Sequence, residues 1–73
     1  MIDVGQLRMW KKREDAEQFY NIAEGTICLV IQCFDNGHDI YGARPRTCTV
    51  MQDGETPWFL EGELEEHTVL VEP

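Results

Sequence analysis

The chain of 73 residues contains no serine, only six lysines and arginines, and no long apolar run. The absence of serine excludes a Ser-His-Asp catalytic triad. No segment approaches the roughly 18 consecutive apolar residues that a membrane-spanning helix needs. The N-terminus, Met1–Gly5, carries neither a basic leader nor an apolar core. We therefore expect neither a secretion signal nor a membrane partner.

Cysteine is scarce, and its number, three, is odd for a disulfide framework. We expect free thiols packed as small hydrophobic residues in a reducing compartment, with one disulfide plus a spare thiol as the alternative. A hairpin centred near residue 38 would place Cys28 opposite Cys48. Cys28 and Cys33 are five residues apart on one expected strand, so they should point to opposite faces. Because zinc sites need closely grouped ligands, we expect no metal and no cofactor.

The short length also argues against an enzyme. A chain of this size buries only roughly 60–65% of its unfolded surface, and ligand pockets typically need about 300 Å³ or more. Nucleophilic catalysis would need a thiolate beside a base, yet Cys28 lies in an apolar run that disfavours the thiolate. We expect His38 in an exposed turn and His67 just before the last strand. The prediction is a protein without enzymatic activity and without catalytic residues.

Charge is strongly acidic, at −8, and unevenly distributed. The final segment, residues 53–73, holds seven carboxylates and no lysine or arginine. This balance disfavours nucleic-acid binding. The basic residues fall in two clusters and interleave with aromatic residues, as in single-strand binders, but we expect them to pair with nearby carboxylates. These basic residues are Arg8, Lys11, Lys12, Arg13, Arg44 and Arg46.

Alternating apolar residues and turn signals predict one domain, residues 1–73, of five short strands. A long loop, Lys12–Gly25, should follow the first strand, and Asp35–Asp39 with its Asn-Gly pair should turn the central hairpin. Pro45 should mark an edge or a bulge. One 3₁₀ turn fits Gly62–His67. The expected strands are Gln6–Lys11, Thr26–Phe34, Ile40–Gln52, Pro57–Glu61 and Thr68–Val71.

The order of these elements resembles that of SH3-like barrels. The start V-G-Q-L-R-M-W resembles that of small SH3-like and KOW-like modules. The segment T-V-M-Q-D-G-E-T-P-W-F-L-E-G-E-L resembles an ending found in short uncharacterised proteins of tailed bacteriophages, with Met51 in place of a core tryptophan. The resemblance implies an all-β, five-stranded, partly open barrel and an accessory protein in a host cytoplasm. It implies no specific activity, because SH3-like folds serve many functions.

An aromatic pair beside the acidic run of residues 61–66 indicates protein binding. Trp58 and Phe59 are adjacent in a strand, so one should face inward and the other outward, either exposed or covered by the Lys12–Gly25 loop. Exposed aromatic residues commonly supply binding energy at interfaces. We therefore predict a non-enzymatic interaction module that binds another protein. An acidic mimic of nucleic acid and an accessory enzyme subunit are the alternatives, and a homodimer through an edge strand is possible. The predicted contact residues are Tyr20, Tyr41, Trp58, Glu61, Glu63, Glu65 and Glu66.

Overall fold

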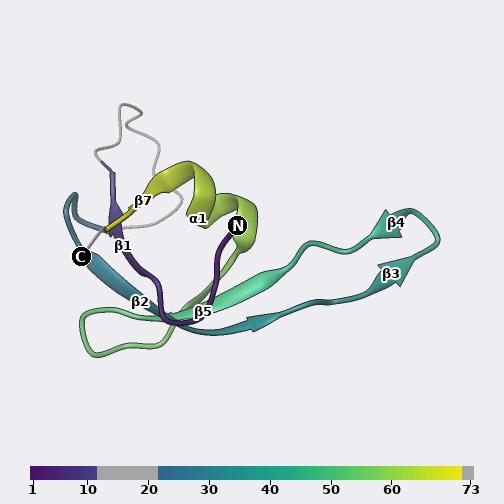
Figure 1. The fold of residues 1–73 in the computed structure, drawn as a ribbon, viewed down its shortest axis with the longest axis horizontal. Helices are drawn as coiled ribbons and strands as arrows, with labels where there is room; N and C mark the ends of the chain where they lie inside the picture. The colour runs from purple at the N-terminus through teal and green to yellow at the C-terminus, as the bar shows by residue number, and fades with distance from the viewer. Residues whose placement is uncertain (12–21, 72–73) are drawn as a thin grey trace.

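The computed structural model describes residues 1–11 and 22–71 (Figure 1). It is mainly β, with a five-stranded antiparallel sheet in the order β6-β5-β2-β1-β7, a separate β3–β4 hairpin and one helix. Across the described ranges, β6 and β7 form the two edges of the sheet and no closed barrel is present. The elements are β1 (Leu7–Trp10), β2 (Ile27–Phe34), β3 (His38–Asp39), β4 (Gly42–Ala43), β5 (Thr47–Met51), β6 (Trp58–Leu60), α1 (Glu61–His67) and β7 (Thr68–Leu70).

The central hairpin, β2 with β5, forms because both strands are rich in β-branched residues. A shift in register interrupts their pairing between Val30 and Gln32. This bulge reverses the alternation, so that Cys33 as well as Cys28 faces the core. The expectation that these two cysteines point to opposite faces is therefore wrong. The partner of Cys48 across the strands is Cys33, not Cys28.

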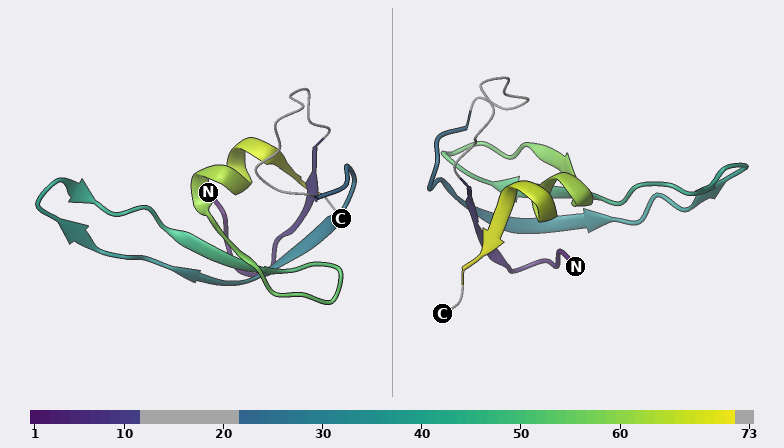
Figure 2. Two further views of the ribbon diagram at one scale, coloured as in Figure 1. Left: turned by 180° about the vertical axis from the view of Figure 1, so that it is seen from behind. Right: turned by 90° about the horizontal axis from the view of Figure 1, so that it is seen from above.

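The turn of this hairpin lies farther along the chain than expected. Ile40 and Tyr41 form it, because Asp39 pairs with Gly42 at the end of the β3–β4 hairpin. The expected turn at Asn36-Gly37 is wrong, since the Asn36 amide instead reaches across to the Pro45 carbonyl at 2.7 Å. The result is an arm, residues 35–46, that projects away from the rest of the molecule (Figures 1 and 2).

Pro45 lies in this arm between β4 and β5, outside both strands. Proline has no N–H to donate to a strand ladder, which agrees with its place outside the regular pairing. The expected strand Ile40–Gln52 is consequently too long. Within this segment, pairing with β2 is confined to Thr47–Met51.

An α-helix, α1, stands where one 3₁₀ turn was expected. Its first backbone donor, the Leu60 N–H, is satisfied by the Glu63 carboxylate at 2.9 Å. Glu61 and Glu63 lie in its first turn, where carboxylates favour helix formation. Leu64 anchors the helix in the core. Docking through Leu64 stabilises a helix of seven residues that would be marginal in isolation.

The core lies on one face of the sheet. The N-terminal segment and α1 lie together on this side of the β2–β5 hairpin (Figure 2). Trp10 and Phe59 pack edge to face, with ring centroids 5.1 Å apart. The buried hydrophobic residues are Ile2, Trp10, Cys28, Val30, Cys48, Val50, Phe59 and Leu64.

A chain of polar contacts joins the first strand to the last. The buried Arg8 donates from Nε to the Thr68 hydroxyl at 2.7 Å, and this hydroxyl donates in turn to the Leu64 carbonyl. The cation thus lies near the C-terminal end of α1, where positive charge is favourable. These contacts fix β1, α1 and β7 relative to one another.

Candidate functional site

The sheet face opposite the core is also apolar. We call it the outer face, and strand alternation together with the register of pairing defines its members. Apart from the half-buried Leu29, the large hydrophobic side chains on it are between 37% and 65% exposed. Among the residues of the five described strands, none with a charged side chain lies on this face. Its residues are Leu7, Met9, Ile27, Leu29, Gln32, Phe34, Thr47, Thr49, Met51, Trp58, Leu60 and Val69.

The register places these residues in rows across the strands. One row runs Leu7, Leu29 and Met51 over β1, β2 and β5. A second row, nearer the arm, runs Gln32, Thr49 and Trp58 over β2, β5 and β6. Met51, expected in the core, lies on this outer face and is 49% exposed.

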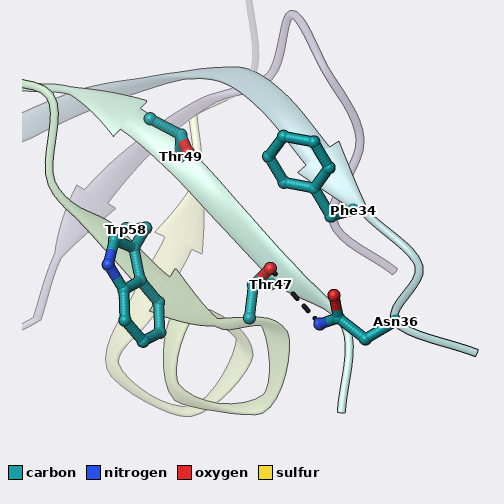
Figure 3. Close-up of a pocket in the computed structure, with 5 residues that line it drawn as sticks. All are labelled: Phe34, Asn36, Thr47, Thr49 and Trp58. Carbon is teal, nitrogen blue, oxygen red and sulfur yellow. Dashed lines mark hydrogen bonds between the residues drawn. The ribbon is translucent and has the colours of Figure 1, made fainter. Parts of the chain in front are cut away.

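A shallow hollow of about 290 Å³ lies at the arm end of the outer face (Figure 3). Phe34 from β2 and Trp58 from β6 stand on either side of β5, and Thr47 and Thr49 of β5 lie between them. The Asn36 amide closes one end, donating to the Pro45 carbonyl and to the Thr47 hydroxyl at 3.5 Å. The hollow is thus an apolar seat with small side chains at its centre.

The lining of this hollow is apolar with a few uncharged hydrogen-bonding groups. Its described residues contribute two aromatic rings, two threonine hydroxyls and one asparagine amide. Its volume lies at the lower limit of small-molecule pockets, which hold about 300–1,000 Å³. An open seat of this size suits an apolar side chain of another protein.

Trp58 is the predicted contact residue that lines the hollow. It is 65% exposed, while its neighbour Phe59 is buried. The prediction that one of the two faces outward and the other inward is therefore confirmed. Tyr41 is 91% exposed at the tip of the arm, where its N–H donates to the Asp39 carboxylate at 2.7 Å. The structure does not bring Tyr41 to Trp58. Tyr20 lies outside the described residues.

The four predicted glutamates all lie on α1, and two of them have structural partners. Glu61 forms an ion pair with Arg46, whose guanidinium also donates to the Ile2 carbonyl at 2.6 Å. Glu61 further accepts the Ile2 N–H at 3.3 Å, so this group holds the N-terminus against the sheet. Glu63 caps the helix.

The other two glutamates are more exposed. Glu65 lies 3.5 Å from the N-terminal amine, and Glu66 lies 3.9 Å from His67. Exposed pairs of this kind contribute about 0–1 kcal/mol. Of the acidic run, Glu65 and Glu66 are therefore the residues available to a partner.

We expect Glu61→Gln to lower the free energy of unfolding by about 1–3 kcal/mol, because it removes a charged acceptor from Arg46. Glu65→Gln, the matched control on the same helix, should change it by less than about 0.5 kcal/mol. Urea denaturation of both variants measures the difference. Equal effects would show that Glu61 is an ordinary solvated carboxylate.

The cysteines of the structure are free thiols, two of them buried. Burial raises the pKa of the Cys28 thiol, and burial together with a hydrogen bond to Cys33 raises the pKa of Cys48 to about 12. Buried neutral thiols are poor nucleophiles. Within residues 1–11 and 22–71, no group of three or more His, Cys, Asp or Glu side chains gathers in a way that could hold a metal ion.

Sequence reasoning missed Phe34 and the extent of the outer face. Alternation from the buried Cys28 and Val30 places Phe34 inside, but the bulge turns it outward. The apolar residues in β1 and β5 were a signal that both faces of the sheet are hydrophobic. α1, the helix of the described ranges, is far too short to traverse a bilayer.

Comparison of the chain with protein-family models, with curated proteins and with solved structures gave no match. The outer face and its hollow are therefore the features of the molecule that bear on its function.

Proposed function

We propose that the protein is a non-enzymatic interaction module that binds another protein through the Trp58–Phe34 hollow. One observation carries the proposal: two exposed aromatic side chains flank an apolar hollow on a sheet face to which the described strands contribute no charged side chain. The cores of protein interfaces are depleted in charged residues and enriched in aromatic ones. A partner's apolar side chain seated between the rings would supply most of the binding energy.

The fold interpretation that accompanies this proposal is an SH3-like, partly open barrel. The strand order β6-β5-β2-β1-β7 supports it, because the first strand lies between the second and the last. The long segment between β1 and β2 and the helical element before β7 are also consistent with it. Such a fold does not by itself select a function, so the hollow carries the functional argument. An accessory role in a bacteriophage rests on the sequence resemblance.

The nucleic-acid mimic is the less favoured hypothesis, because Glu61 and Glu63 of the acidic run are engaged within the molecule. The two hypotheses differ in the variants that abolish binding. A mimic depends on the exposed carboxylates and on low salt, whereas an aromatic seat depends on Trp58.

A photo-cross-linking amino acid at position 58 would capture the partner, with the same amino acid at the exposed Val4 as the control position. We expect Trp58→Ala to weaken binding of the captured protein at least about tenfold, measured by calorimetry. Thermal unfolding should be nearly unchanged, since the side chain is exposed.

The double variant Glu65→Gln/Glu66→Gln should retain the wild-type affinity and its weak salt dependence. Loss of binding in this variant with full binding by Trp58→Ala would reject the hollow and support the acidic mimic.

A further inference from the structure

We propose that the outer face binds a second copy of this chain, so that the protein forms a face-to-face dimer with two-fold symmetry. The inference rests on the proposed function, because it names the partner of the same hollow. It depends on three properties of the described residues: an uncovered layer, its area and its lack of charge.

The sheet has an apolar layer on each face, and among residues 1–11 and 22–71 only the core face has other elements packed on it. Leu64 of α1 and Ile2 of the N-terminal segment cover the core face. On the outer face, Met51, Trp58 and Phe34 remain about half exposed or more. Sheets with two apolar faces are typical of proteins in which another layer packs on each side. A second sheet from a second copy would supply the missing layer.

The area of the outer face matches what a dimer needs. With about 150–250 Å² for each large side chain, the exposed apolar residues of this face present on the order of 700 Å². The largest apolar patch of a typical monomer covers about 300–600 Å². A stable interface buries about 800 Å² on each partner. The outer face thus exceeds an ordinary surface patch and approaches the size of an interface.

Charge favours a second copy over a basic partner. A chain with a net charge of −8 repels its own kind at every surface where carboxylates would meet. The outer face is free of charged side chains, so two copies can join there without opposing carboxylates in the contact. A basic partner would gain no ion pair on this face. Apolar complementarity is what the face offers, and a second copy provides it.

In a dimer with two-fold symmetry, each copy can fill the hollow of the other. In an isologous contact both copies present the same patch, so every contact between two residues occurs twice, once in each direction. Thr47 and Thr49 leave space between the rings of Phe34 and Trp58, so the hollow can receive a large side chain. In the proposed dimer, Trp58 of each copy enters the hollow of the other.

The sheet edges are less suited to self-association. The edge strands β6 and β7 contain three residues each, so a ladder along either edge would contain few hydrogen bonds. Short edge strands are a common protection against pairing between chains. The face, and not an edge, is therefore the proposed contact.

Sedimentation equilibrium of the whole chain over a range of concentrations tests the proposal. We expect wild-type protein to dimerise, and Trp58→Ala and Met51→Glu each to raise the dissociation constant at least about tenfold. The two substitutions lie in different rows of the outer face, and both side chains are exposed, so folding should survive. Tyr41→Ala, which removes an exposed aromatic residue from the arm tip, is the matched control and should leave the dimer intact. Salt should tighten the dimer or leave it unchanged, since it screens the repulsion between acidic copies.

A wild-type chain that stays monomeric up to millimolar concentration would overturn the dimer, as would a dimer that both face variants leave unchanged. If the monomer still cross-links a different protein through position 58, the proposed function stands and the self-association falls. If neither a second copy nor another protein is captured, both proposals fail.

Discussion

Replacing Leu64 by alanine should lower the free energy of unfolding by about 2–5 kcal/mol, the usual cost of emptying a leucine site in a core. Leu64 is fully buried, and it is the buried residue of α1. A domain of this length has a total stability of about 4–11 kcal/mol, at roughly 0.05–0.15 kcal/mol per residue. The variant should therefore be partly unfolded at growth temperature.

The mechanism of this loss extends beyond the cavity. Without the Leu64 side chain, a helix of seven residues lacks the packing that stabilises it. Urea denaturation measures the loss, and Glu66→Ala on the exposed side of α1 is the control, with an expected change below about 0.5 kcal/mol. A loss under 1 kcal/mol for Leu64→Ala would mean that α1 contributes little to the core.

The second large effect is a loss of stability in alkali that depends on Cys48. Burial raises the pKa of this thiol to about 12 in the folded chain. In the unfolded chain the thiol titrates near its ordinary value, about 8.5. Between these values the folded state holds a proton that the unfolded state has lost. Stability is therefore complete below the unfolded pKa and falls as the pH rises towards the folded one.

Raising the pH from 8 to 10 should lower the free energy of unfolding by about 1–2 kcal/mol through Cys48, at 1.36 kcal/mol per pKa unit. Other groups also titrate in alkali, so the measurement is the difference in slope between wild type and Cys48→Ala. The variant loses some stability at every pH but should have the shallower slope between pH 8 and 10. Identical slopes would show that the Cys48 thiol ionises as readily in the folded chain as in the unfolded one.

Features that depend on neighbouring residues could be predicted from the sequence. The Asp53-Gly54 pair is a local turn signal, and a tight turn forms there with positive φ at both residues. The apolar run of β2 forms a strand because β-branched residues suit an extended backbone. The division of Trp58 and Phe59 between outside and inside follows from the two-residue period of a strand. Trp58, one of the two aromatic residues that flank the hollow, could be predicted in this way.

Features that depend on long-range contacts could not be predicted. The Asn-Gly pair has the right chemistry for a turn, yet contacts across the arm move the turn to Ile40 and Tyr41. Residues 61–67 have helix-forming side chains. They form the α-helix α1, and not a single turn, because Leu64 packs into the core. Glu61 belonged to an acidic run in the sequence, and only the fold gave it Arg46 as a partner.

The sequence by itself determined that several strands exist and roughly where they lie, because residue type and spacing control the backbone locally. The tertiary structure decided which side chains each face presents. One extra residue in β2, at the bulge between Val30 and Gln32, turns Cys33 inward and Phe34 outward. Such a shift arises from pairing with β5, about twenty residues away, and leaves no periodic signal in the chain. The hollow between Phe34 and Trp58, and with it the proposed binding surface, exists because of that shift.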